Sequence, residues 1–360
     1  MQLNFLNRFL NPVSLDIGMD LGTANSLIYV KGKGIILNEP SVVAIDQKTK
    51  KPFGFGQEAK DMLGRTPQRY KAIRPLKDGV IADLEATEMM ISHFLRKACP
   101  RNSFIMRTRM VIGVPSGITQ VEEHIVYKAA EKVGLGPQDW GQNILVEEPL
   151  AAAVGANLPI LTPKGNMIVD IGGGTTEVAV ISMGQIVVSE SLSIAGDEMN
   201  DAIIQYMRKV HNLVIGESTA EQVKIQMGAA WQPEEERSTL IKGLHLTTGL
   251  PSSVKITSSE VCEALQEPLK AIIECVRRTL ENTPPELAGD IIEQGIVLAG
   301  GGAMLYGLDK ILSIATEVAV HIAEQPLICV ARGTGIIVEE LAQRQDSKLI
   351  QLLEYKTKRR

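Results

Sequence analysis

The chain has 360 residues, of which 44% are hydrophobic and 22% charged, and its formal net charge is −5. This length allows two domains, and the weakly acidic balance argues against nucleic acid as a partner. Aromatic residues make up only 4%, so stacking platforms for bases are not expected. The four cysteines form no zinc-type pair and the N-terminus has no signal-peptide pattern, so we expect buried thiols in a reducing cytosol.

The N-terminal segment, residues 1–11, is amphipathic. Its apolar side chains gather on one helical face, and they are Leu3, Phe5, Leu6, Phe9 and Leu10. The segment is too short to span a bilayer, so a helix lying in the membrane interface is one interpretation. A terminal strap packed on the protein's own core, or a disordered end, is the alternative.

A strand–turn–strand motif follows. Residues 15–46 alternate like strands and are interrupted by glycine and proline. The first turn reads Asp20-Leu21-Gly22-Thr23-Ala24-Asn25, an Asp-x-Gly followed by a hydroxyl. Residues 48–80 are polar and broken by glycine and proline, which indicates a small insertion with a helical piece near 57–63.

A loop after the helix expected over 82–98 is a second candidate for membrane contact. It places three apolar residues between basic ones: Phe104, Ile105 and Met106. An exposed loop of this kind would enter lipid while Arg101, Arg107 and Arg109 meet anionic headgroups. The alternative is that the three apolar residues begin the next strand and are buried.

A candidate catalytic carboxylate ends the next α/β unit. Strands are expected over 110–115 and 143–146, with helices over 119–133 and 150–156. Glu148 comes at the carboxyl end of the second strand, where catalytic groups collect in α/β proteins. Capping of the following helix by the same carboxylate is the structural alternative.

The most informative stretch is Asp170-Ile171-Gly172-Gly173-Gly174-Thr175-Thr176, which lies between two apolar strands. Three glycines in a hairpin turn permit positive φ and close approach to a ligand, and their N–H groups can form an anion-binding nest. Thr175 and Thr176 add hydroxyl donors. Asp170 would repel a phosphate, so it is better interpreted as a partner of hydrated Mg²⁺. A glycine-rich hairpin without a ligand is the alternative.

Other glycine-rich nucleotide motifs do not fit. A dinucleotide fingerprint needs glycines that open a helix, and the lysine-containing phosphate loop occurs nowhere in the chain. The turn at Asp20 instead repeats the turn at Asp170 in weaker form, which suggests an internal duplication. Two half-domains would then face each other and offer one hairpin each to the same polyphosphate.

The C-terminal half continues with helices over 198–211 and from Gly216. Glu221 and Lys224 share one face of the second helix, where they form either a ribose grip or a surface ion pair. Residues 232–258 form a second polar insertion, and one long helix is expected over 260–283. Residues 295–303 are interpreted as a strand, three glycines and a helix start. A strand over 318–323, a helix over 333–341 and a basic tail close the chain.

Taken together, the motifs at Asp20, Asp170 and Gly300 resemble the phosphate and adenosine motifs of the actin, heat-shock chaperone and sugar-kinase superfamily. Further segments are similar to the MreB family of bacterial actins: Ile81-Ala82-Asp83, Val111-Ile112-Gly113-Val114-Pro115, Val146-Glu147-Glu148-Pro149, Ala195-Gly196-Asp197-Glu198-Met199 and Thr283-Pro284-Pro285-Glu286-Leu287. This similarity covers residues 15 to 345, nearly the whole chain.

The resemblance implies an α/β, actin-like fold of the duplicated ribonuclease H-like type, with two halves of two subdomains each around a nucleotide cleft. The segments would be 12–43, 77–156 and 326–347 for subdomain IA, 44–76 for IB, 157–192 and 257–325 for IIA, 193–256 for IIB, and 348–360 for a basic tail.

The resemblance also implies a site for ATP and Mg²⁺. Asp20 and Asp170 would hold the metal through water, and Glu148 and Thr175 would orient the attacking water. The nucleotide would contact Gly22, Thr23, Ala24, Asn25, Gly172, Gly173, Gly174, Thr175, Glu217, Thr219, Ala220, Glu221, Lys224, Gly300, Gly301, Gly302 and Ala303.

The function implied is that of a weak ATPase that polymerises, in paired protofilaments, on the inner face of the cell membrane. It would work with membrane proteins of the cell-elongation machinery to maintain rod shape. A kinase on the same scaffold is the main alternative, although neither an acceptor base nor a substrate pocket can be assigned. A chaperone ATPase is a second alternative, for which no peptide-binding domain is apparent.

Overall fold

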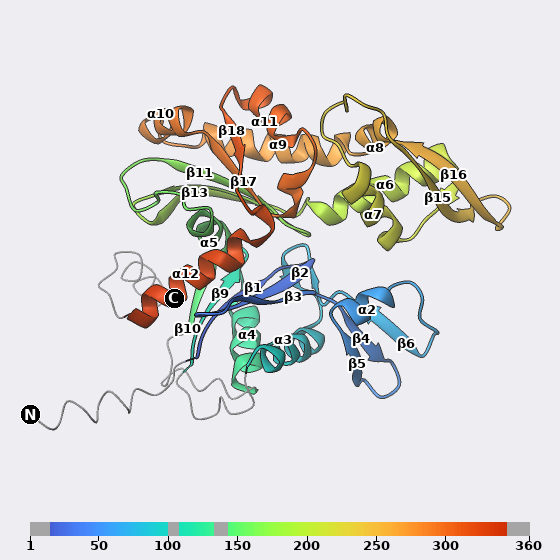
Figure 1. The fold of residues 1–360 in the computed structure, drawn as a ribbon, viewed down its shortest axis with the longest axis horizontal. Helices are drawn as coiled ribbons and strands as arrows, with labels where there is room; N and C mark the ends of the chain where they lie inside the picture. Colours follow the sequence, from blue (N-terminus) through green and yellow to red (C-terminus); the bar gives the residue numbers. More distant parts are fainter. Residues whose placement is uncertain (1–14, 100–107, 133–142, 344–360) are drawn as a thin grey trace, which may run out of the picture.

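A computed structural model describes residues 15–99, 108–132 and 143–343. Its core consists of two large sheets stacked one above the other, each extended on the same side by a smaller unit (Figure 1). No helix within these ranges is both long enough and apolar enough to cross a bilayer.

The first large sheet begins with the expected hairpin. The first three strands form an antiparallel meander, and two later strands join the first in parallel. Across the sheet the order is β10 (Asn143–Glu147), β9 (Thr108–Val114), β1 (Leu15–Leu21), β2 (Asn25–Val30) and β3 (Gly34–Pro40). Helices α3 (Leu84–Ala98) and α4 (Gln120–Lys132) lie beside each other below this sheet (Figure 1).

The second large sheet repeats the first. An antiparallel meander is again joined on one side by two parallel strands. Across the sheet the order is β18 (Val320–Ile322), β17 (Ile296–Ala299), β11 (Asn166–Ile171), β12 (Thr176–Ser182) and β13 (Gln185–Leu192). The equivalent strand order confirms the predicted duplication, and it places Asp20 and Asp170 one residue before the ends of equivalent strands.

Two helices fill the space between the sheets: α5 (Glu148–Gly155) and α12 (Cys329–Gln343) (Figure 1). They approach so closely that a Cβ on Gly155 would lie 1.9 Å from the Cys329 carbonyl oxygen. A Cβ on Gly333 would lie equally close, 1.9 Å, to the carbonyl oxygen of Ala151. Both positions therefore require glycine, because any side chain would force the helix backbones apart.

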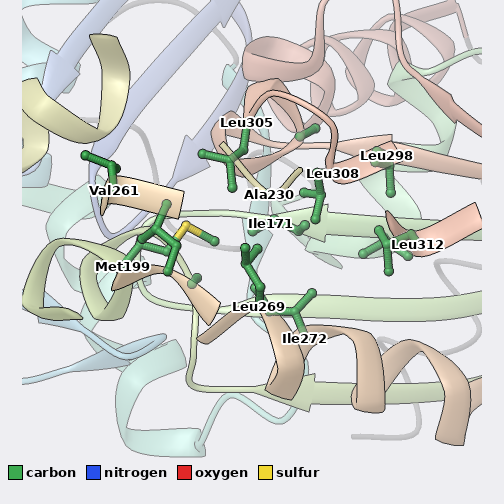
Figure 2. Packing of buried hydrophobic residues seen from close by; sticks show 14 of the residues in the cluster. Ile171, Met199, Ala230, Val261, Leu269, Ile272, Leu298, Leu305, Leu308 and Leu312 are labelled. Carbon is green, nitrogen blue, oxygen red and sulfur yellow. The ribbon is translucent and has the colours of Figure 1, made fainter. Parts of the chain in front are cut away.

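The second half has its own core above its sheet. Strand residues Ile171 and Leu298 pack against Leu269, Leu308 and further residues of α9 (Gln266–Glu281) and α11 (Leu308–Thr316), as Figure 2 shows. This core continues to Met199 of α6 (Gly196–Val210). The glycine hairpin that ends β11 is thus anchored in the largest apolar cluster of the described residues.

The smaller units overlap the predicted insertions, 48–80 and 232–258, but each begins before the insertion does. The first combines β4 (Val43–Asp46), β5 (Pro52–Phe55) and β6 (Tyr70–Ile73) with α2 (Gln57–Asp61). The second has β14 (Leu213–Val214), β15 (Ser238–His245) and β16 (Pro251–Thr257), beside α6 and α7 (Glu217–Met227). A short hairpin, β7 (Leu76–Lys77) and β8 (Val80–Ile81), returns the chain from the first unit to the large sheet.

Three expectations in the C-terminal half need correction. The helix expected over 260–283 is divided into α8 (Ser258–Ala264) and α9, because Pro268 has no N–H for the Ala264 carbonyl. A helix not expected, α10 (Pro285–Gln294), begins at the second proline, which suits a first helical position. The glycine run opens a short 3₁₀ turn, η2 (Gly301–Met304), and the α-helix begins only at Leu308.

The expectation that the cysteines are buried thiols is confirmed in part. All four are free thiols. Cys275 and Cys329 are buried, whereas Cys99 and Cys262 are only half-buried.

Candidate functional site

A cavity of about 450 Å³ lies between the two halves. Its wall includes fifteen residues that the sequence assigned to the site: Asp20, Gly22, Thr23, Ala24, Asn25, Glu148, Asp170, Gly172, Gly173, Thr175, Glu221, Lys224, Gly300, Gly301 and Gly302. They come from positions up to 282 residues apart, so only the folded chain brings them together.

The two hairpin turns meet at the cavity. A Cβ on Gly173 would lie 2.7 Å from the Cβ of Ala24 and 3.0 Å from its backbone nitrogen. A Cβ on Gly174 would lie 2.9 Å from Thr23 Cγ2. This close approach is what requires glycine here, since none of the three glycines has the positive φ that the sequence suggested.

The threonines of the second turn have different roles. Thr175 lines the cavity with its side chain packed towards the β7–β8 turn, where a Cβ on Gly79 would lie 2.5 Å from Thr175 Cγ2. Thr176 is fully buried, and its hydroxyl donates to the Ile194 carbonyl at 2.8 Å. Its predicted role as a donor to the ligand is therefore wrong.

Three buried carboxylates face this cavity: Asp20, Asp170 and Glu148. Burial raises the pKa of Asp20 to about 7, and burial together with the charges of Asp20 and Glu177 raises that of Asp170 to about 8. The pKa of Glu148 is raised well above its usual value by burial and then by the charges of Asp20 and Asp170. A bound cation would relieve the repulsion among these buried carboxylates and favour their charged forms.

Hydrated Mg²⁺ fits these carboxylates. Among the residues that the structure describes, no three side chains of histidine, cysteine, aspartate or glutamate converge to hold a metal by themselves. Mg²⁺ is commonly bound by one or two carboxylates, substrate phosphates and several waters. Asp20 and Asp170, presented by equivalent strands, supply the protein part of such a set.

Glu148 is the first residue of α5, so its carboxylate lies in the first turn of that helix, as the structural alternative expected. The N-cap residue is Glu147, whose side chain makes no capping hydrogen bond. The Glu148 side chain is 8% exposed and contributes to the cavity wall. Glu148 thus combines a position in the first turn of α5 with a position in the cavity wall.

Helix α7 forms another wall. The Lys224 ammonium donates to the Gly196 carbonyl at 2.5 Å, and burial lowers its pKa. Glu221 accepts from Lys60 at 2.9 Å and also lines the cavity. Its ion-pair partner is therefore not Lys224, with which the structural alternative paired it.

Five assigned residues do not line the cavity. Ala220 and Ala303 are fully buried and pack in the core of the second half. Gly174 packs so that an added Cβ would meet Thr23 and the Asp78 backbone nitrogen. Glu217 is ion-paired with Arg74 at 2.7 Å, and Thr219 lies in the first turn of α7.

Several lining residues were missed. Asp197, whose pKa burial raises to about 6, follows the turn already noted as a helix start. The other missed residues of the cavity wall are largely apolar, and they include Ile225, Met304, Leu305, Pro326 and Leu327. No motif marks these residues in the sequence, because isolated apolar side chains are usually core residues.

The membrane assignments fall on residues 1–14 and 100–107, which lie outside the described residues. Arg109 is described, and its proposed contact with headgroups is wrong. Its guanidinium donates to Asp16 Oδ1 at 2.7 Å and to the Leu341 carbonyl at 3.1 Å. Asp16 is 1% exposed, so this arginine compensates a buried charge within the fold.

Comparisons with known proteins place the chain in a family. The model of the family described as MreB/Mbl protein matches residues 14–346. The cell shape-determining protein MreB of Escherichia coli is 49% identical over 339 residues, 93% of this chain and 96% of that protein. Mbl of Bacillus subtilis is 48% identical over 335 residues, 93% of this chain and 98% of that protein.

A solved structure of a family member has the same fold. MreB 5 of Spiroplasma citri bound to AMPPNP superposes with a TM-score of 0.86 at 39% identity, covering 92% of this chain and 98% of that one. The fold is therefore the actin-like one that the sequence implied. With a family match across nearly its whole length, the chain belongs to the MreB/Mbl family of actin-like, cell shape-determining proteins.

Proposed function

We propose that this chain binds and slowly hydrolyses Mg·ATP in the cavity between its halves and that the bound nucleotide controls its assembly into filaments. The observation that supports this most directly is the contact between the Gly172–Thr175 turn and the Gly22–Asn25 turn. Each turn offers backbone N–H groups from a different half of the molecule. A triphosphate held by both would favour the closed arrangement of the halves.

The roles of the residues follow from their positions. Asp20 and Asp170 would hold Mg²⁺ through water, and the ion would neutralise phosphate charge when bound. Glu148 and Thr175 would orient the attacking water, with Glu148 suited to accept a hydrogen bond or a proton at its carboxylate. Lys224 and Glu221 would hold the ribose end. The apolar side chains of Met304 and Leu327, which line the cavity, would contact the base.

The cellular role would be that of the relatives. Polymers, in paired protofilaments, would lie on the inner face of the cell membrane and guide the membrane proteins of cell elongation. The predicted four subdomains would supply the filament contacts, with the small units as IB and IIB. Weak contacts of each subunit with lipid would add through avidity in a filament.

Sedimentation tests this proposal against a kinase or a chaperone. Purified protein with Mg·ATP and no other substrate is expected to pellet, and phosphate release is expected to follow assembly. A matched sample without nucleotide should pellet less. Protein that binds no nucleotide, or that transfers phosphate only to an added small molecule, would contradict the proposal.

A further inference from the structure

Two ion pairs connect the small β4–β6 unit of the first half with α7 of the second. Lys60 of α2 donates to Glu221 Oε1 at 2.9 Å, and Arg74 donates to Glu217 Oε1 at 2.7 Å. The partners are 161 and 143 residues apart in the chain. Figure 1 shows both elements on the same side of the molecule, away from the α5–α12 contact that joins the large sheets.

The pairs are only partly exposed. The side chains of Lys60 and Glu221 are 23% and 19% exposed, and those of Arg74 and Glu217 are 13% and 40% exposed. Partial burial reduces screening by water and salt, so these pairs attract the β4–β6 unit to α7 more strongly than freely exposed pairs would.

The same charges reach the nucleotide cavity. Glu221 and Lys224 line it, one helical turn apart on α7. Asp197, also in the wall, is near enough to Arg74 and Lys224 for their charges to lower its pKa against the larger effect of burial. The cluster thus contains three cations, Lys60, Arg74 and Lys224, opposed by four carboxylates, those of Asp197, Glu198, Glu217 and Glu221.

We propose that Lys60 and Arg74 are positioning residues that hold α7 against the β4–β6 unit and thereby slow nucleotide release. The inference rests on the proposed function, because it assigns a rate-setting contact to the same cavity. With the pairs intact, Glu221 and Lys224 remain at the ribose end. When the pairs separate, α7 can move away from the first half, and the cavity opens on that side.

The expected effect is modest and measurable. A partly exposed ion pair changes an equilibrium by roughly twofold to fivefold, and release through the opened state should accelerate by a similar factor. Loss of both pairs should accelerate release by roughly tenfold, since neighbouring pairs in one network do not add independently. Raising the salt concentration should accelerate release from the parent protein more than from a variant without the pairs.

Displacement of a fluorescent ADP by excess ATP, followed in a stopped-flow instrument, measures this rate. Arg74→Met and Lys60→Met should each release the probe faster. Arg74→Glu should be faster still, and the exchanged pair Arg74→Glu with Glu217→Arg should return towards the parent rate. Arg69→Met is the matched control, because it removes a pair with Asp46 inside the β4–β6 unit and should leave release unchanged.

The outcomes separate the two proposals. Unchanged release from Arg74→Met and Lys60→Met, or an exchanged pair as fast as Arg74→Glu alone, would overturn this inference while nucleotide binding stands. A parent protein that does not bind the fluorescent ADP would overturn the proposed function and this inference together.

Discussion

Replacement of Gly173 by alanine tests the close contact between the two hairpin turns at the cavity. The added Cβ would lie 2.7 Å from the Cβ of Ala24 and 3.3 Å from its Cα. Non-bonded carbon atoms are most stable about 3.5–4.0 Å apart, so the two turns must separate by roughly 1 Å. Both turns end strands with buried residues, so the strain cannot be relieved by one flexible side chain.

The magnitude follows from the cost of overpacking. Inserting a methyl group into a closely packed contact costs about 1–3 kcal/mol. If this strain falls on the closed, nucleotide-bound arrangement, the affinity for ATP should fall by about fivefold to a hundredfold. The expected effect on the midpoint of thermal unfolding without nucleotide is smaller, because the turns can part when no triphosphate holds them together.

Fluorescence titration with a labelled ATP measures the affinity, and calorimetry measures the unfolding temperature. Gly289→Ala is the control, because a Cβ at this position in α10 meets no atom within 4 Å. Alanine there should preserve binding and stabilise the helix by up to about 1 kcal/mol. A Gly173→Ala variant that binds ATP as tightly as the parent would refute the inference that the two turns hold one triphosphate between them.

Three further predictions concern chemistry, pH and lipid. Glu148→Gln should slow phosphate release by about a hundredfold or more while ATP affinity changes little; an unchanged rate would exclude Glu148 from the reaction. Because the pKa values of Asp20 and Asp170 are raised to about 7 and 8, the folded state keeps protons that the unfolded state loses near pH 4. In protein without metal and nucleotide, the free energy of unfolding should therefore fall as pH rises from about 4 to 8. Asp170→Asn should make this pH dependence weaker in denaturant titrations. Deleting residues 2–10, or changing Phe104 and Ile105 to serine, should release the protein from anionic liposomes, and undiminished co-sedimentation would argue against a membrane role for these residues.

Local patterns were sufficient for most elements. The hairpin at Asp170 and its weaker copy at Asp20 are recognisable because glycine separates two apolar, strand-like runs in each. The break at Leu265 was not recognised, although Pro268 is visible in the sequence, because the apolar periodicity continues across it. The requirement for glycine at 173 was predicted for the wrong reason: φ is ordinary there, and contact with Ala24 excludes a side chain.

The site was predictable where charge or glycine marks it and not elsewhere. Arg109 was predicted to contact lipid because of the basic residues around it. In the fold its guanidinium is instead paired with the carboxylate of Asp16, 93 residues away. The apolar wall residues Met304 and Leu327 are marked by no motif in the sequence. The pairs of Lys60 and Arg74 with α7 join residues whose proximity no local pattern encodes.

The sequence by itself determined the duplicated strand–turn–strand units, the carboxylates at their ends and the family to which the chain belongs. These are local features, set by short-range backbone preferences and by residue type. Only the tertiary structure decided which residues touch across the cavity, which charges are already paired within the fold and which glycines are needed for space. Those contacts depend on two sheets held together by the close crossing of α5 and α12, and packing over such separations leaves no mark in any short stretch of chain.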